Sequence, residues 1–283
     1  MKQRIITGAV FTVIIVAFLA PAFFWPIFIL LLTAVVSIIA TFELIRAVRV
    51  KNKSIMPWVV WIGSMMSFIP ALTYFCVDSP YVAFVIYALP VLVYVFVSTM
   101  VPPILKEDPD ALNAGVASSS LILYISFPIA CANIMALYVK HGWYFVVLGL
   151  FSPWISDVFA YFTGSFFGKH KICPHISPKK TWEGCIGGAV CCAIVTGLFF
   201  ALVMNRIVDS DLPFALYVAL ATVSGLILSV VSQLGDWLAS AIKRMVGIKD
   251  YGNIMPGHGG VMDRFDSAFF TLPIAFAMAL LLV

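Results

Sequence analysis

Charged residues are scarce in this chain. Asp, Glu, Lys and Arg together make up 11% of its 283 residues, while 63% are hydrophobic. A soluble domain does not carry so large an apolar share, so the soluble classes of protein are excluded. The composition predicts an all-α, polytopic integral membrane protein in contact with the lipid bilayer. Low-complexity tracts, convincing repeats and a separate soluble domain are also missing.

Cysteine occurs at only six positions, and no two of them form a CxxC pair. A zinc site is therefore not expected. Most of the cysteines fall in apolar segments, where we interpret them as small core residues rather than as a disulfide framework. The net charge of +4 is small, and we expect no nucleic acid partner.

The apolar segments predict nine membrane-spanning helices. They cover approximately residues 5–20, 27–44, 56–75, 81–100, 114–138, 143–168, 182–204, 214–244 and 264–283. The first follows a basic start, as a signal peptide does. A second apolar segment follows almost at once, so we interpret the first as a retained helix.

The distribution of Lys and Arg predicts the orientation, because cytoplasmic loops of membrane proteins are enriched in both. With the N-terminus in the cytoplasm, every Lys and Arg except Lys140 and Arg206 falls on the inner side. We therefore predict an N-in, C-out protein of the inner (cytoplasmic) membrane. The polar loops 169–181 and 245–262 then face the cytoplasm, where nucleotides are found.

Charge is distributed unevenly between the two parts of the chain. Residues 1–100 hold four predicted helices with almost no intramembrane charge, and we interpret them as an N-terminal scaffold. Glu43 ends the second span and is expected at the membrane interface near Arg46. Residues 101–283 hold five predicted helices and both polar loops, and we interpret them as the catalytic region.

The segment 240–266 concentrates the charge that the rest of the chain lacks: four cations, three carboxylates and a histidine. Gly257, Gly259 and Gly260 permit backbone conformations closed to other residues and let main-chain N–H groups approach a ligand. Loop charges that only set topology do not require glycines and paired acids beside them. We therefore predict a ligand-binding loop.

Three carboxylates predict a site for Mg²⁺. Asp263 and Asp266 are three residues apart, so a helix starting there would place both on one face. The long eighth span brings Asp236 to the level of the inner lipid phosphates, on a polar stripe with Gln233 and Ser240. Oxygen ligands of this kind suit Mg²⁺, which keeps water or phosphate as its other ligands.

Asp157 lies in the middle of the sixth span and shares one helical stripe with Tyr161, Gly164 and Gly168. A carboxylate at that depth is costly and indicates a function or a buried partner. The alternative is a purely structural pair with a lysine or a tyrosine. The spacing of Gly164 and Gly168 permits another helix to approach closely.

The loop before the seventh span predicts an anion site. Ser177 as N-cap and Pro178 at the first helical position are typical of a helix start. Lys179 and Lys180 would then lie in the first turn, which is unfavourable unless an anion binds there. The alternative is that both lysines serve only as a topology signal.

Three blocks of the sequence resemble the phosphatidate cytidylyltransferase family, also called CDP-diacylglycerol synthase. The main block spans 27 residues of this chain, and Met255 in it departs mildly from the expected Leu, Ile or Phe. Its matching positions are Ser240, Lys243, Arg244, Lys249, Asp250, Gly252, Pro256, His258, Gly259, Gly260, Asp263, Arg264 and Asp266. The other two blocks are Asp157-x-x-Ala-Tyr-x-x-Gly164 and Ser177-Pro-Lys-Lys-Thr-Trp-Glu-Gly184. The resemblance implies an enzyme that makes CDP-diacylglycerol and pyrophosphate from CTP and phosphatidate with Mg²⁺.

On this hypothesis, the metal ligands for one or two divalent cations are Asp236, Asp263 and Asp266, with Lys243 and Arg264 as further catalytic residues. The substrate-binding residues are Asp157, Lys179, Lys180, Thr181, Glu183, Ser240, Arg244, Lys249, His258, Gly259 and Gly260. A symmetric homodimer is the default expectation for the assembly.

Other functions share some of these features. A CTP-dependent lipid kinase with a polyprenol acceptor would use the same nucleotide and metal. An ion-coupled transporter would also carry intramembrane acids, but across the full depth of the membrane rather than in its cytoplasmic half. A CDP-alcohol phosphatidyltransferase is excluded, since its Asp-Gly-x-x-Ala-Arg pattern is missing.

Overall fold

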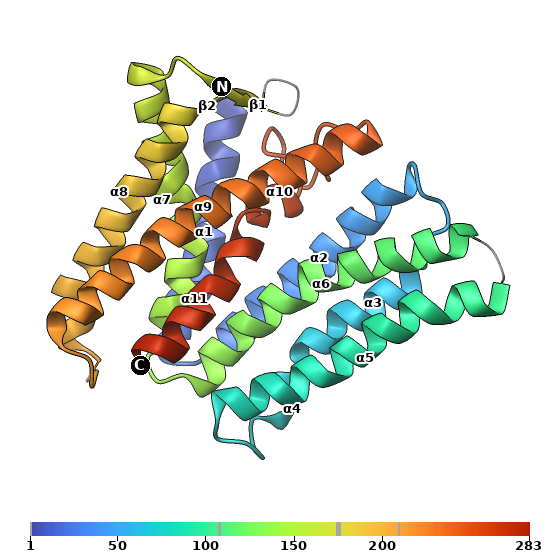
Figure 1. Ribbon diagram of the computed structural model, residues 1–283, viewed down its shortest axis with the longest axis horizontal. Helices are drawn as coiled ribbons and strands as arrows, with labels where there is room; N and C mark the ends of the chain where they lie inside the picture. Colours follow the sequence, from blue (N-terminus) through green and yellow to red (C-terminus); the bar gives the residue numbers. More distant parts are fainter. Residues whose placement is uncertain (1, 107–108, 174–176, 209) are drawn as a thin grey trace. The chain divides into compact units, whose positions relative to one another are not determined.

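The computed structural model describes residues 2–106, 109–173, 177–208 and 210–283. The long helices are α1 (Lys2–Ala22), α2 (Ile27–Arg49), α5 (Pro80–Lys106), α6 (Pro109–Tyr138), α7 (Gly142–Phe167), α8 (Trp182–Leu202), α9 (Phe214–Val246) and α11 (Ala268–Leu282) (Figure 1). The short ones are α3 (Pro57–Met65), η1 (Met66–Phe68), α4 (Ile69–Thr73), η2 (Met204–Arg206) and α10 (Met262–Phe265). Strands β1 (Lys171–Cys173) and β2 (Ser177–Thr181) form an antiparallel ribbon. The all-α prediction is confirmed, with this ribbon as an addition.

Six described helices are long and apolar enough to cross a membrane: α2, α5, α6, α7, α8 and α9. Shorter apolar helices at Ile6–Ala22, Pro57–Thr73 and Ala268–Leu282 coincide with the first, third and ninth predicted spans. The protein is therefore a polytopic helical membrane protein. The count of nine spans and the N-in orientation stay predictions.

Contacts divide the chain into two compact units. Unit 1 comprises Met1–Tyr138 and Ile242–Arg264, and unit 2 comprises Val139–Ala241 and Phe265–Val283. Each unit combines a long continuous stretch with a short C-terminal piece. The predicted division at residue 100 is a functional one and stays a prediction.

Unit 1 is built around α6, which α2, α3 and α5 flank (Figure 1). Ile122, Ile125 and Ile129 on α6 are fully or almost fully buried. Asn133 on the same helix ties two neighbours together: its Oδ1 accepts a hydrogen bond from Thr33 on α2 at 2.8 Å, and its Nδ2 donates to the Ser67 carbonyl at 3.1 Å. Such interhelical polar contacts stabilise packing where no water is available.

Unit 2 packs α7 against α8 and α11. Small residues allow the close approach, as the sequence predicts for the glycine stripe of α7. A Cβ on Gly164 would lie 2.9 Å from Thr181 Oγ1 and 3.5 Å from the Gly184 Cα. Ser156 on α7 and Ser229 on α9 share a buried hydrogen bond of 2.6 Å, so α9 is held to the same core.

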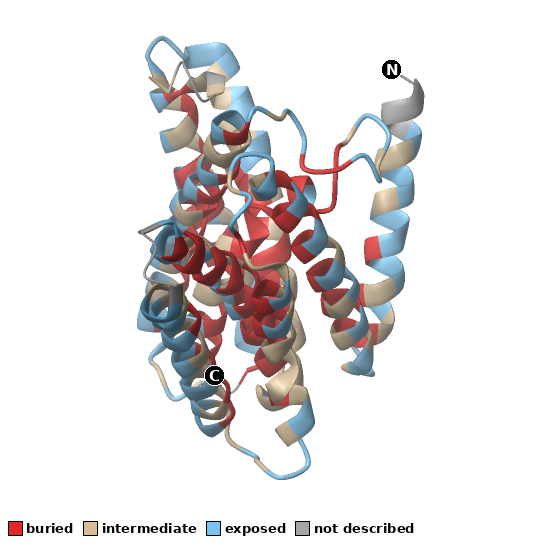
Figure 2. Ribbon diagram, turned by 90° about the vertical axis from the view of Figure 1, so that its right-hand side faces the viewer, coloured by how far each residue is buried: buried red, intermediate tan, exposed pale blue. Residues whose placement is uncertain are grey.

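The outer helix faces are apolar and exposed, which fits contact with lipid. Leu89, Leu92 and Phe96 on α5 are each at least 60% exposed. Figure 2 shows exposed positions along the lengths of helices and not only at their ends. Exposed apolar surface on this scale is unusual for a soluble monomer and normal for a membrane protein.

The predicted helix start at Ser177 is wrong. Ser177–Thr181 is strand β2, paired with β1, and α8 begins at Trp182. Thr181 is the actual N-cap, and its Oγ1 accepts a hydrogen bond from Gly184 N at 3.3 Å. The lysines therefore precede the helix and do not lie in its first turn, because pairing with β1 satisfies the backbone of this stretch.

The single helix expected from Asp263 onward is also interrupted. The short helix α10 ends at Phe265, and Asp266 and Ser267 form a turn before α11. Asp266 Oδ1 accepts a hydrogen bond from Ser267 N at 2.7 Å. A short side chain that bonds its neighbouring backbone competes with helix formation, so one continuous face does not carry both aspartates.

Candidate active site

A cavity of about 460 Å³ lies in unit 2 among α7, α8, α9 and the β-ribbon. Its size is in the range of small-molecule sites. The residues that line it are Asp157, Ala160, Tyr161, Gly164, Ser165, Lys171, Lys180, Thr181, Gly184, Cys185, Gln233 and Asp236. Two of the three sequence blocks, 157–164 and 177–184, therefore meet here with Gln233 and Asp236 of α9, although these segments are far apart in the chain.

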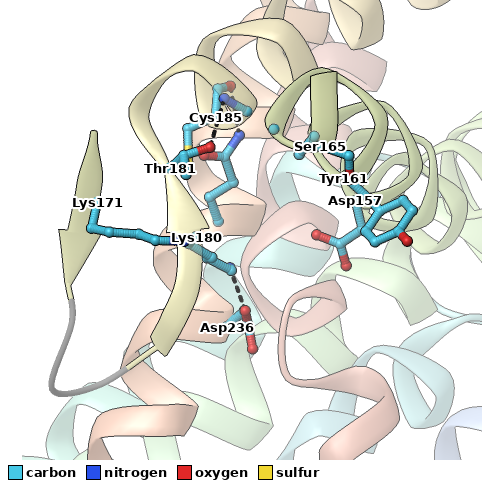
Figure 3. Close-up of a pocket in the computed structure, with 12 residues that line it drawn as sticks. Asp157, Tyr161, Ser165, Lys171, Lys180, Thr181, Cys185 and Asp236 are labelled. Carbon is cyan, nitrogen blue, oxygen red and sulfur yellow. Dashed lines mark hydrogen bonds and ion pairs between the residues drawn. The ribbon is translucent and has the colours of Figure 1, made fainter. Parts of the chain in front are cut away.

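Charged groups of both signs face this cavity. Lys180 on β2 makes an ion pair with Asp236 on α9, and their side chains are 22% and 30% exposed. The Lys180 ammonium also lies 5.6 Å from the centre of the Trp237 ring. In Figure 3 the Asp157 carboxylate points into the same cavity from α7. Partly buried charges are weakly screened by salt, so this site can attract an anion or a metal ion strongly.

The cavity wall is fixed by a polar network between helices. Gln233 Nε2 donates to the Cys185 carbonyl and to Ser229 Oγ, both at 3.1 Å. Ser229 in turn bonds Ser156, the neighbour of Asp157. This network joins α7, α8 and α9, so it holds Asp157 and Asp236 in fixed positions. Gln233 and Asp236 of the predicted polar stripe line the cavity.

Glu183 anchors the ribbon beside this cavity. Its carboxylate accepts hydrogen bonds from Lys169 N at 3.1 Å and His170 N at 3.3 Å, and it lies 2.7 Å from His170 Nδ1. These bonds fix the start of the ribbon that carries Lys171 and Lys180. Direct substrate contact by Glu183 stays a prediction.

The second cluster of predicted residues lies in unit 1, around Asp263. Its Oδ1 accepts a hydrogen bond from Lys243 Nζ at 2.7 Å. Its Oδ2 accepts from Tyr251 N at 2.8 Å and Gly260 N at 2.9 Å. Lys243 and Asp263 are 14% and 3% exposed. The carboxylate therefore joins the two ends of the 251–260 loop to each other and to Lys243.

Two glycines in this loop adopt the left-handed backbone conformation that the sequence predicts. Gly257 has φ +78° and Gly259 has φ +82°. They form a tight turn closed by a hydrogen bond from Met255 N to the Gly259 carbonyl at 2.9 Å. A Cβ on Gly259 would lie 2.7 Å from Asp263 Oδ2, so the glycine is needed for space as well as for its φ.

Glu43 is a site residue that sequence reasoning placed in the scaffold. Its side chain belongs to α2, is buried, and accepts hydrogen bonds from Val261 N at 3.2 Å and Met262 N at 2.8 Å. Gly252 and Gly260 pack directly on this carboxylate. The one available signal was an acid that follows a long apolar stretch of the same helix, since an acid within a membrane helix indicates a buried partner by default.

The remaining predicted residues are more exposed. Arg244, Lys249 and Arg264 are exposed in unit 1, and Ser240 is partly buried on α9 in unit 2. His258 is partly buried, and its Nδ1 has no hydrogen-bond partner among the described residues. The side chain of Lys179 lies outside the described residues.

Known proteins share much of this sequence. The sequence pattern of the cytidylyltransferase family matches residues 2–282. This chain belongs to that family. It is 42% identical over 135 residues to a phosphatidate cytidylyltransferase of Staphylococcus saprophyticus, and 44% identical over 133 residues to one of Staphylococcus haemolyticus. The first alignment covers 48% of this chain and 48% of the relative, so it spans about half the length of each.

The carboxylates of this cytidylyltransferase-family chain have the right chemistry for Mg²⁺, which binds oxygen ligands. Asp236 and Asp263 each face a lysine ammonium, which shows that both carboxylates attract cations. Of the three predicted metal ligands, Asp263 belongs to unit 1, and Asp236 and Asp266 belong to unit 2. Across residues 2–106, 109–173, 177–208 and 210–283, no three His, Cys, Asp or Glu side chains form a ready metal-binding group. Convergence of the three aspartates on a cation is therefore part of the proposal below.

Proposed function

We propose that this protein transfers the cytidylyl group of CTP to phosphatidate and forms CDP-diacylglycerol and pyrophosphate. The observation that carries the proposal is the unit 2 cavity, where the Lys180–Asp236 pair and Asp157 face one space beside a membrane-spanning helix. Membership of the cytidylyltransferase family supports the nucleotide, and the relatives named above support the lipid acceptor. The predicted orientation places this site toward the cytoplasm.

The main obstacle to this reaction is repulsion between two polyanions. A phosphate oxygen of phosphatidate attacks the α-phosphorus of CTP, the new O–P bond forms, and the bond to the β-phosphate bridging oxygen breaks. The phosphomonoester is already anionic near neutral pH, so a strong general base is not required. The residues of this chain have to position the two phosphates and neutralise their charge.

Lysines of the cavity are suited to that neutralisation. Lys180 is held at the cavity wall by Asp236 and Trp237, and Lys171 lines the same space. An anionic phosphate can replace the carboxylate as the partner of an ammonium group without loss of charge compensation. In unit 1, Lys243 would neutralise phosphate charge beside Asp263. The exposed side chains of Arg244, Lys249 and Arg264 would bind the leaving pyrophosphate.

Asp236, Asp263 and Asp266 are the residues that would hold one or two Mg²⁺ ions. The metal would supply additional charge neutralisation for the phosphate oxygens. Asp263 accepts three hydrogen bonds out of about four acceptor positions on a carboxylate, so about one position is left for a metal ion. The Gly260 amide already donates a hydrogen bond to Asp263. The groups left in this loop to bind phosphate oxygens would therefore be the turn at Gly257–Gly259 and His258.

An assay with two acceptors tests the proposal. Purified protein is incubated with CTP, Mg²⁺ and either phosphatidate or an isoprenoid alcohol, and pyrophosphate and lipid product are followed. CDP-diacylglycerol and pyrophosphate are expected with phosphatidate only. A phosphorylated isoprenoid would instead establish a polyprenol kinase, and the absence of any CTP consumption would leave the transporter as the better hypothesis.

A further inference from the structure

A second pocket lies at the end of α2 in unit 1, and none of the residues assigned above lines it. Its volume is about 560 Å³, and it is lined by Phe42, Ile45, Arg46, Arg49, Val50, Lys53 and Trp61. Three of these seven side chains are cations, and the other four are apolar or aromatic. The pocket therefore offers a positive group and an apolar surface side by side.

The cations of this pocket are available for a ligand. Arg46, Arg49 and Lys53 are exposed, and none of them makes an ion pair with a carboxylate in the described part of the chain. The nearest acid along the helix, Glu43, is already engaged with the amides of Val261 and Met262. The Glu43 carboxylate offsets part of the charge of Arg46, but the three cations around one pocket still repel each other, and an anion between them would offset that repulsion.

A topology signal alone does not account for this arrangement. Positive-inside charge requires Lys and Arg near a helix end but no pocket and no aromatic wall. Lys51 belongs to the same charge run and is exposed, yet it does not line the pocket. It supplies a matched control, because it has the same charge at the same end of α2.

The apolar side of the pocket indicates an amphiphile. Phe42 and Val50 are 55% and 57% exposed, and Trp61 completes the wall. Helix α2 is long and apolar enough to span a membrane, so its end lies at headgroup level, where tryptophan is typically found. The cytoplasmic leaflet, which the predicted orientation assigns to this end, is rich in anionic lipids.

We propose that this pocket binds the phosphate of an anionic phospholipid through Arg46, Arg49 and Lys53, with the proximal acyl chain against Phe42 and Trp61. The site is separate from the nucleotide chemistry proposed above and does not depend on it. A free phosphate ion shares the chemistry of the headgroup but has no apolar part that could pack against the apolar wall.

Native mass spectrometry in a neutral detergent tests this site without CTP or turnover. The protein is titrated with short-chain phosphatidylglycerol, with phosphatidylcholine of the same chain length, or with inorganic phosphate. The triple variant R46Q/R49Q/K53Q is expected to lose one phosphatidylglycerol site by about 100-fold in affinity, since each cation near a lipid surface contributes roughly fivefold. The variant K51Q is expected to keep it. Arg49→Gln alone, at an exposed position, gives a milder test that does not threaten folding, with roughly a fivefold loss.

Three kinds of result would overturn the proposal. One is equal phosphatidylglycerol retention by wild type and the triple variant. Another is an equal loss in K51Q, which would mean a general field effect and not a pocket. The third is displacement of the lipid by inorganic phosphate at matched concentration, or equal binding of phosphatidylcholine, because either would remove the case for an anionic phospholipid.

Discussion

Asp236 and Asp263 show how the same residue type serves different local needs. Asp236 faces a cavity and pairs with one lysine side chain, whereas Asp263 also accepts two backbone amides. Removing the charge from Asp236 therefore affects mainly the site, while removing it from Asp263 also affects the loop. A variant at Asp236 is the cleaner probe of chemistry.

For Asp236→Asn we expect CTP-dependent turnover to fall by at least about 100-fold, as for loss of a preorganised electrostatic group. Stability should change by less than about 1 kcal/mol, because the ion pair that is lost is partly exposed. Steady-state kinetics and thermal unfolding in detergent measure the two effects. Asp211→Asn, at an exposed position before α9, is the control and should leave both unchanged. Turnover close to wild type in Asp236→Asn would remove this residue from the site.

Backbone conformation at Gly259 can be tested separately from charge. We expect Gly259→Ala to abolish turnover, since its φ of +82° disfavours a side chain and the new Cβ would meet Asp263 at 2.7 Å. The left-handed conformation alone costs about 1–2 kcal/mol. Gly247→Ala is the matched control, because Gly247 has φ +77° with no atom within 4 Å of its Cβ position. If both variants lose activity equally, the contact with Asp263 is not the reason for the glycine.

At the scale of elements, α2 anchors the segment at Val261 and Met262 through the side chain of Glu43. Two consecutive amides depend on this carboxylate, and an unsatisfied buried donor costs about 1–3 kcal/mol. Helix α2 therefore contributes to the proposed active site even though it carries no other predicted site residue. The interpretation of the first four spans as a scaffold is too narrow for this helix.

For Glu43→Gln we expect faster hydrogen exchange at the amides of Val261 and Met262, because the amide group of Gln offers one acceptor where the carboxylate offers two. CTP-dependent turnover should fall in the same variant. Hydrogen exchange with mass spectrometry measures the first effect. In Glu183→Gln, which affects the other anchored segment, exchange should rise at Lys169 and His170 and stay unchanged at 261–262. Unchanged protection at 261–262 in Glu43→Gln would contradict the anchoring role.

The elements themselves were largely predictable, because the helices are apolar and long. Spans six, seven and eight begin and end within two residues of α7, α8 and α9, counting from the predicted boundaries. The predictions were wrong where a polar side chain or a strand partner determines the local secondary structure. The ribbon at Ser177–Thr181 depends on pairing with Lys171–Cys173, and the break at Asp266 depends on a side-chain bond to Ser267. Neither contact follows from periodicity.

At the scale of the whole molecule, the sequence motifs correctly predicted the family, and the chemistry of the candidate site stays a prediction. They could not predict that the segment 240–266 is divided between two compact units, with Lys243 and Asp263 in one and Ser240 and Asp266 in the other. That division depends on long-range packing. Glu43 was missed for the same reason, since its partners lie more than two hundred positions further along the chain.

The predicted orientation can be tested with the native cysteines. Cys76 is exposed in the connection before α5, which the N-in arrangement places outside, and Cys173 is on β1, in the loop that the same arrangement places in the cytoplasm. A membrane-impermeant maleimide applied to intact spheroplasts should label Cys76 and should reach Cys173 only after permeabilisation. Single-cysteine variants provide the control for each position. The reverse labelling pattern would mean an N-out protein.

The bond between Glu43 and residues 261–262 has a consequence for biosynthesis. The acid is translated early, but the amides that satisfy it emerge only when the ribosome has passed Met262. During most of translation the second helix thus holds a carboxylate without these partners inside an apolar segment, which is costly in lipid. A nascent chain that stops short of this point keeps that carboxylate in its second helix without these two amide partners.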